Sequence, residues 1–194
     1  MVRECVGVPG ALVVRLAGHG SRSFVDAGRV HPVGLVAPPM IEMADLMSAD
    51  RVLVGLRAAS KRQLLQELAE EAAATCGLDA SVVLDALMQR EKLGSTAVGE
   101  GIAIPHAKVP GLPKLIGFFA RLARPVDFDA LDDKPVDLVF LLLAPEGGSA
   151  EHLKALARIA RILRDPAMCA RLRQAANADR AYAVLTGQPE SHAA

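Results

Sequence analysis

One stretch of the sequence, residues 90–108, gathers side chains suited to phosphoryl chemistry around a single histidine. His106 follows three glycines, the hydroxyl side chains of Ser95 and Thr96, and Arg90. A neutral imidazole is a good nucleophile near neutral pH. Arginine, hydroxyl groups and backbone N–H groups are the partners that a phosphoryl group prefers. The stretch therefore predicts a histidine that carries phosphate.

A second candidate, His152, lies three residues after Ser149, in the first turn of a predicted helix. The helix dipole there disfavours a charged imidazolium and favours bound anions. A solvent-exposed first-turn residue without a role is an equally open explanation. The remaining histidines lie towards the two ends of the chain and are not assigned to a site: His19, His31 and His192.

Each candidate also has an ordinary explanation when it is taken singly. Arg90 could favour the dipole at a helix C-terminus, and Ser95 and Thr96 could be plain loop residues. Several known site patterns are absent from the sequence, namely the P-loop, the G-x-S-x-G of α/β-hydrolases and H-E-x-x-H. His106 and His152 lack a convincing third zinc ligand. Neither a metal nor a cofactor is predicted.

Composition limits the class of protein. The 194 residues suffice for one ordinary domain, and 52% hydrophobic with 23% charged residues is typical of a globular chain. The formal net charge of zero gives no electrostatic reason to expect a nucleic acid or an anionic membrane as partner. The three cysteines form no disulfide or zinc pattern, which favours a reducing, cytoplasmic setting. No apolar run is long enough to predict membrane insertion.

The first 39 residues differ from the rest. They are rich in glycine and proline, and their apolar run is interrupted by Arg15 without a convincing cleavage site. Residues 1–39 are therefore predicted to be a disordered extension or to reflect a mis-assigned start, with Met40 or Met43 as the true one. The folded domain is predicted over 40–187, followed by a flexible tail over 188–194.

From Met40 onwards the pattern of apolar residues becomes regular. It predicts strands at 52–56, 102–104, 115–122 and 136–143, and helices at 60–77, 80–92, 149–164, 166–176 and 179–185. Ser60 and Gln63 form a capping-box pattern. Helices on both sides of the strands imply a three-layer α/β/α sandwich. The central sheet should be mixed, because three successive strands are joined by loops.

These elements would bring the candidates together. Arg90 falls in the last turn of a helix, so its side chain can project into the glycine-rich loop 94–101. Pro105 restricts Ile104 to an extended conformation and fixes the direction of approach to His106. The imidazole is thus expected at the exit of a strand, a common position for functional groups in α/β proteins.

The same residues carry a family resemblance. Gly-Ser-Thr at 94–96 and Gly-Ile-Ala-Ile-Pro-His at 101–106 closely resemble the signature of the IIA proteins of the bacterial phosphotransferase system (PTS), of the fructose, mannitol and nitrogen-regulatory type. Residues 151–156 and 164–165 resemble the family's second motif, and 135–138 fit as well. The resemblance covers roughly residues 40–185 and implies the PTS IIA type 2 fold.

The resemblance also implies roles. His106 would accept a phosphoryl group on Nε2 from a histidine phosphocarrier protein (HPr- or NPr-like), giving a tele-phosphohistidine. His152 would contact that group without being phosphorylated, and Arg90 would stabilise it. Glu100 matches an acidic residue of mannitol-type members, and Ser95 and Thr96 would support the phosphate.

Within the family the resemblance is strongest to the nitrogen-regulatory type. The chain carries no IIB-like cysteine motif, no membrane segment and no fused carrier domain. Phosphorylation would then regulate partner proteins, such as potassium transport or sensor kinase systems in this family. Two alternatives stay open. One is a sugar-transport IIA component that passes phosphate to a IIB protein, and the other is a non-catalytic binding module of the same fold.

Overall fold

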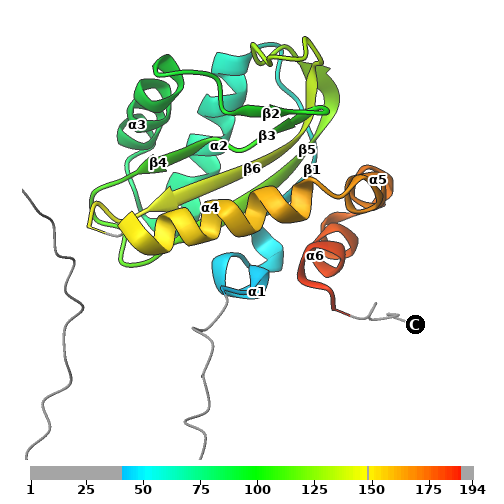
Figure 1. Ribbon diagram of the computed structural model, residues 1–194. Coiled ribbons are helices and arrows are strands. Elements are labelled where there is room, and N and C mark those ends of the chain that lie inside the picture. Colours follow the sequence, from blue (N-terminus) through cyan, green and yellow to red (C-terminus); the bar gives the residue numbers. More distant parts are fainter. Residues whose placement is uncertain (1–40, 148, 189–194) are drawn as a thin grey trace, which may run out of the picture. The chain divides into compact units, whose positions relative to one another are not determined.

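The computed structural model describes residues 41–147 and 149–188 (Figure 1). The predictions for residues 1–39 and for nearly all of the tail lie outside this part of the chain. None of the helices in the described residues is long and apolar enough to cross a membrane.

A mixed sheet forms the centre of the fold. Its strands are β1 (Val52–Leu56), β2 (Ala97–Gly99), β3 (Ile102–Ala103), β4 (His106–Lys108), β5 (Ile116–Val126) and β6 (Val136–Ala144). The order is β1-β5-β6-β3-β2, and β4 also pairs with β6. The pair β5–β6 is antiparallel, whereas β1, β3 and β4 run parallel to their larger neighbours. The predicted mixed sheet is confirmed.

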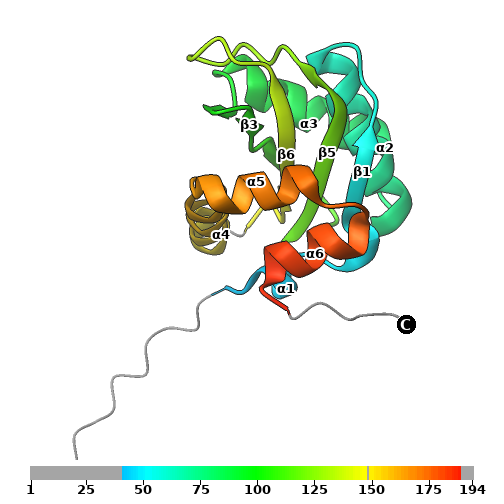
Figure 2. The same ribbon diagram turned by 90° about the vertical axis from the view of Figure 1, so that its right-hand side faces the viewer.

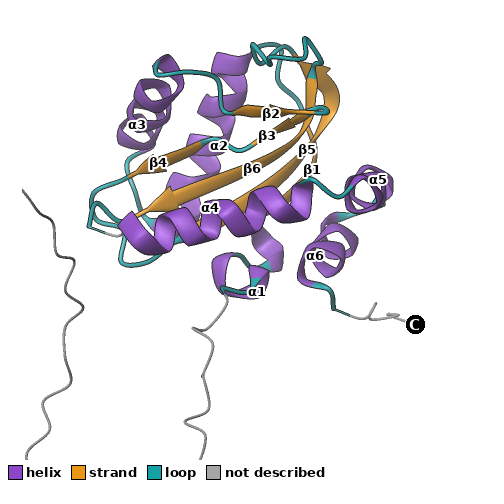
Figure 3. Cartoon of the chain, in the orientation of Figure 1, coloured by secondary structure: helices purple, strands orange, loops and turns teal. Residues whose placement is uncertain are grey.

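Helices cover both faces of the sheet. They are α1 (Met43–Leu46), α2 (Lys61–Cys76), α3 (Ala80–Lys92), α4 (Ser149–Leu163), α5 (Pro166–Gln174) and α6 (Ala178–Thr186), with a 3₁₀ turn at Ala49–Arg51. Buried residues of α2 and α3 pack on one face, and those of α1, α4, α5 and α6 pack on the other. Figures 2 and 3 show the strands enclosed between these two layers. The three-layer α/β/α architecture is as predicted.

Strand β6 joins the two cores. Its side chains alternate between the α2–α3 face and the opposite face, and both sets are fully buried. A strand that is buried on both faces appears in the sequence as a continuous apolar run. This is why the segment 136–143 could be predicted from its residues alone.

The short strands β2 and β4 were not predicted. β2 lies within the segment predicted to be a loop and pairs with β3 around the two-residue turn Glu100-Gly101. Both turn residues have positive φ, +55° and +78°, as a type I′ hairpin turn requires. Glutamate is an unusual residue for that conformation. The sequence therefore lacked the usual signal of a tight hairpin.

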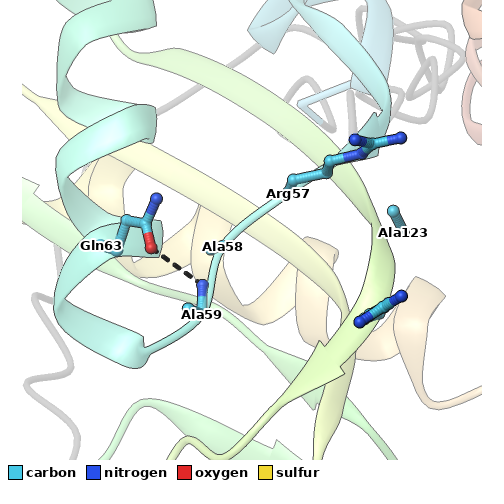
Figure 4. Close-up of a pocket in the computed structure, with 6 residues that line it drawn as sticks. Arg57, Ala58, Ala59, Gln63 and Ala123 are labelled. Atoms are coloured by element: carbon cyan, nitrogen blue, oxygen red, sulfur yellow. Dashed lines mark hydrogen bonds between the residues drawn. The ribbon is translucent and has the colours of Figure 1, made fainter.

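The start of α2 carries the predicted cap. The Ser60 hydroxyl accepts a hydrogen bond from the Gln63 N–H at 3.2 Å, and Gln63 Oε1 accepts one from the Ala59 N–H at 2.9 Å. Figure 4 shows this second bond beside a pocket of about 630 Å³ between the β1–α2 link and β5, lined by Arg57 and Arg124 among others. None of the predicted site residues lines this pocket. The cap fixes the first turn of α2, and with it Lys61.

Candidate active site

His106 begins β4 rather than standing at the exit of a strand. The residues of β3 and β4 pair with β6 at one constant register, Ala103 with Val139 and His106 with Leu142. The two strands are thus a single line of pairing, interrupted at Ile104 and Pro105, and proline has no N–H for the ladder. The strand that begins at Ile102 does end before Pro105, as predicted, but the new strand that begins at His106 was not predicted.

Two hydrogen bonds fix the imidazole of His106 at its opposite nitrogens. Nδ1 lies 2.8 Å from the carbonyl oxygen of Ile104, and the Arg90 Nε–H donates to Nε2 at 3.0 Å. A carbonyl oxygen can only accept, so the proton of the neutral ring is assigned to Nδ1. Nε2 then carries the free electron pair, which is the nucleophilic form of that atom.

Arg90 reaches His106 from the helical layer formed by α2 and α3. It lies in the last turn of α3, as predicted, and its Nη1 donates to the Gly94 carbonyl at 3.0 Å. The guanidinium is therefore held by two acceptors, one on the ring and one on the loop. Figure 1 shows α3 beside β4, which explains how a residue of this helix reaches the strand.

His152 faces His106 from α4. The two ring centroids are 5.6 Å apart and the rings are almost perpendicular, at 83°. His152 is only 7% exposed, so the explanation of a solvent-exposed residue is wrong. Its Nε2 atom is buried and has no hydrogen-bond partner within the described residues. An unsatisfied ring nitrogen beside the nucleophile is available to a ligand that enters the site.

Both imidazoles are held in the neutral state. Burial lowers the pKa of His106, the positive charge of Arg90 lowers it further, and the Ile104 carbonyl and Glu91 partly oppose this shift. Burial also lowers the pKa of His152, and the neighbouring His106 and Lys108 act in the same direction. At neutral pH His106 is therefore uncharged, as a nitrogen nucleophile must be.

A pocket of about 370 Å³ opens over the two rings. Its lining includes Gln89 and Arg90 of α3 and Leu93 directly after this helix, together with His106, Lys108 and His152. The basic side chains of Arg90 and Lys108 favour an anionic ligand. Leu93 at this pocket is 84% exposed, which gives the site an apolar border. The arrangement can accept a phosphoryl group on Nε2 and neutralise its charge.

The matching family model is described as "Phosphoenolpyruvate-dependent sugar phosphotransferase system, EIIA 2" and covers residues 45–187, well over half of the chain. The chain belongs to this family. The resemblance predicted from the two histidine motifs is confirmed.

Similar proteins indicate the branch of the EIIA family. A nitrogen regulatory protein of Bradyrhizobium diazoefficiens is 54% identical over 151 residues, covering 78% of this chain and 99% of the relative. The structure of nitrogen regulatory protein IIA-Ntr from Neisseria meningitidis has a TM-score of 0.70 and 34% identity, covering 73% of this chain and 97% of that one. These similarities confirm the predicted nitrogen-regulatory resemblance.

A mannitol-type EIIA protein has the same fold. It was solved in the complex of enzyme IIAMTL and phosphorylated enzyme IIBMTL from Escherichia coli, with a TM-score of 0.62 and 25% identity. The match covers 73% of this chain and 99% of that one. The fold of this EIIA domain is thus shared with enzyme IIAMTL.

The other predicted site residues of the EIIA domain have partners elsewhere. Ser95 donates its hydroxyl to the Phe128 carbonyl at 2.7 Å, and Thr96 donates its hydroxyl to Glu91 at 2.7 Å. Glu100 is exposed and forms an ion pair with Lys134 at 2.8 Å. Their predicted contact with phosphate stays a prediction, while Arg90, His106 and His152 lie together at one pocket.

One residue beside the site was missed in the sequence. Glu91, directly after Arg90, is buried and lies 2.7 Å from Lys61 Nζ, forming a buried ion pair. A charged residue near a helix end normally faces solvent, so its type and spacing gave no signal.

Within the described part of the chain, no group of three or more histidine, cysteine, aspartate and glutamate side chains is arranged to hold a metal ion.

Proposed function

We propose that this protein is a phosphocarrier of the nitrogen-related PTS that accepts a phosphoryl group on Nε2 of His106. The observation that carries the proposal is the pair of hydrogen bonds on the ring. The Ile104 carbonyl keeps the proton on Nδ1, and Arg90 lies 3.0 Å from Nε2. The nucleophilic nitrogen and the group that would neutralise phosphoryl charge therefore meet at the same point.

The donor would be the phosphohistidine of a small HPr- or NPr-like carrier protein. The phosphorus–nitrogen bond of the donor breaks as the bond to Nε2 of His106 forms, and its electron pair stays on the donor nitrogen. The Nδ1–H remains in place, so the phosphorylated ring carries one positive charge beside the negative phosphoryl oxygens. Arg90 has to release its hydrogen bond to Nε2 before the attack, because that bond occupies the attacking electron pair, and it can then donate to the phosphoryl oxygens. The unsatisfied ring nitrogen of His152 is the second group that would contact them. No metal ion is required in this scheme.

Regulation of partner proteins is the proposed outcome. The relatives named nitrogen regulatory protein support this branch of the family. The phosphoryl group itself carries about −1.5 to −2 charges at pH 7, enough to change which partner a surface binds. Partners such as potassium transport or sensor kinase systems are expected, and the exchange would take place in the cytoplasm. A pull-down comparing wild type, His106→Ala and His106→Asp tests for partners that depend on this charge.

Phosphorylation itself can be tested directly. The protein is incubated with phosphoenolpyruvate, the first enzyme of the relay and the carrier protein. The expected result is an acid-labile phosphate on the wild type that is absent from His106→Ala. The absence of any label on the folded wild type would disprove the proposal and leave the non-catalytic binding module as the explanation.

Sugar transport is a second candidate, because the fold matches an EIIA protein that was solved with its phosphorylated IIB partner. The labelled protein is mixed with fructose- or mannitol-type IIB proteins and the phosphate is followed. Transfer to a IIB protein at the rate of its own EIIA partner would favour transport. Retention of the label on His106 supports the regulatory function.

A further inference from the structure

We propose that Glu91 is a positioning residue of this site, which aligns both Arg90 and His106 through its contacts with Thr96. The inference rests on the proposed function of His106 and adds to it a residue that touches neither the ring nor the phosphoryl group. Glu91 acts through the loop 94–96, which connects α3 to β2.

The Glu91 carboxylate has three donors. Oε1 lies 2.7 Å from Lys61 Nζ and accepts the Thr96 N–H at 2.9 Å, and Oε2 accepts the Thr96 hydroxyl at 2.7 Å. The carboxylate side chain is only 6% exposed. Removing a charge from water is costly, and an apolar pair can often replace a buried ion pair without loss of stability. A buried carboxylate whose two oxygens both have donors therefore points to a role in aligning the residues that donate to it.

The far end of this ion pair is fixed. Lys61 is the first residue of α2, directly after its Ser60 cap. Its ammonium also donates to the Asp129 carboxylate at 3.0 Å and to the Phe128 carbonyl at 3.3 Å. Ser95 donates to the same Phe128 carbonyl at 2.7 Å. The loop is therefore anchored to the neighbouring residues Phe128 and Asp129, directly through Ser95 and indirectly through Lys61.

Thr96 passes this alignment to His106. The Thr96 carbonyl accepts the Ile104 N–H at 3.0 Å. The Ile104 carbonyl in turn receives the Nδ1–H of the imidazole at 2.8 Å. A displaced Thr96 would thus move the acceptor that selects the tautomer of the nucleophile.

The same loop passes the alignment to Arg90. The Gly94 carbonyl, two residues before Thr96, accepts from Arg90 Nη1 at 3.0 Å, while Arg90 Nε donates to His106. One planar guanidinium can satisfy both acceptors only when the loop carbonyl is in place. Stabilisation of transferring charge depends steeply on such placement.

The test compares Glu91→Ala with Asp85→Ala, which removes an exposed carboxylate from the same helix. Two readouts are taken: the rate of His106 phosphorylation at saturating donor, and the ¹⁵N resonances of the His106 ring. For Glu91→Ala we expect a rate about ten- to a hundredfold lower, a shifted Nε2 resonance and a folded protein. Asp85→Ala should match wild type in both readouts. Thr96→Val, which keeps the ion pair, should shift the ring resonances in the same direction and slow transfer less.

The outcomes separate this inference from the proposed function. A folded Glu91→Ala protein with wild-type rate, or with a slowed rate and unchanged ring resonances, overturns the positioning role. If Glu91→Ala does not fold, unchanged ring resonances in Thr96→Val overturn it instead. If the wild type takes no label, the proposed function fails, and the ring resonances alone still decide whether Glu91 aligns the site.

Discussion

At the scale of the residue, the two nitrogens of His106 have different and fixed tasks. The Ile104 carbonyl holds Nδ1, and Arg90 lies at Nε2. The ring therefore does not need to rotate or change tautomer before it reacts. This arrangement is stable only while the ring is neutral, and its burial keeps it so.

Replacement of Arg90 by lysine should slow phosphorylation of His106 about ten- to a hundredfold. Lysine keeps the positive charge but lacks the planar fork that serves the ring and the Gly94 carbonyl together. The rate of labelling by the phosphorylated carrier measures the effect. Arg124→Lys, at an exposed position of β5, is the matched control and should leave the rate unchanged. A wild-type rate in Arg90→Lys would show that the planar, multi-donor geometry of the guanidinium is not needed for phosphorylation.

Acid should weaken the fold through the two rings. Burial lowers the pKa of His106 and His152 below the ordinary value of 6.5. Below that value the unfolded chain binds protons that the folded protein excludes, so the free energy of unfolding falls as the pH falls. Above pH 6.5 the two rings are neutral in both the folded and the unfolded protein, so they add nothing to the pH dependence of the free energy of unfolding.

Urea unfolding at about pH 7.5 and about pH 5.5 measures this linkage. His106→Gln removes one of the two rings, so its loss of stability between these conditions should be smaller than that of wild type. An equal loss in both proteins would show that the pKa of His106 is not lowered by the fold.

At the scale of the element, a two-residue hairpin turn and an ion pair hold the β2–β3 segment in place. Arg173 of α5 makes a bidentate contact with Asp137 of β6, at 2.7 and 2.8 Å, and donates to the Glu100 carbonyl at 2.8 Å. Gly101 lies directly under this contact. The turn is therefore fixed by residues distant in sequence.

Gly101→Ala should destabilise the domain by about 1–3 kcal/mol more than Gly111→Ala. Both glycines have nearly the same positive φ, +78° and +80°, so the strain of the backbone is shared. A Cβ at Gly101 would lie 2.9 Å from atoms of both Arg173 and Asp137, whereas one at Gly111 meets nothing within 4 Å. Chemical denaturation of the two variants gives the difference. Equal losses of stability in the two variants would show that the Arg173–Asp137 ion pair can shift to accommodate the added Cβ without a cost in free energy.

The elements that the sequence predicted well are those with a repeating pattern. The apolar face of α2 and the continuous run of β6 appear in the residues because burial imposes them. The strands β2 and β4 have three residues each, too few to show a period. Their positions depend on pairing with distant residues of the sheet, which composition does not reveal.

The site was predicted unevenly for a similar reason. His106 and Arg90 could be identified because a family motif and a helix end place them together. Ser95 and Thr96 carry the same hydroxyl chemistry, but their hydroxyls bond to Phe128 and Glu91. Only three-dimensional packing shows which partner each hydroxyl takes.

At the scale of the whole molecule, the absence of net charge makes phosphorylation a large relative change. Lysine and arginine together number 22, as do aspartate and glutamate, so the formal charge is zero. A single phosphoryl group then sets the sign of the molecule's charge. Under the proposed regulatory function, a partner would therefore distinguish the two states by the sign of their charge.

The phosphorylated protein should focus at a lower isoelectric point than the unmodified chain, because the phosphoryl group carries about −1.5 to −2 charges at pH 7 and the proton retained on Nδ1 offsets at most one of them. Native isoelectric focusing after incubation with the phosphorylated carrier measures the shift. Brief acid treatment should reverse it, and His106→Ala should not show it. A shift that persists in His106→Ala would place the phosphate on another residue.

The short strand β4, which begins with His106, also bears on how readily the protein aggregates in a crowded solution. Within the described residues β4 pairs with β6 alone, so its other side is an open edge of the sheet. Open edges can recruit strands from other molecules and start aggregation. Here the edge is three residues long, ends in the exposed Lys108 and lies beside α3. It offers only a short stretch of backbone to an added strand, which limits aggregation through this edge.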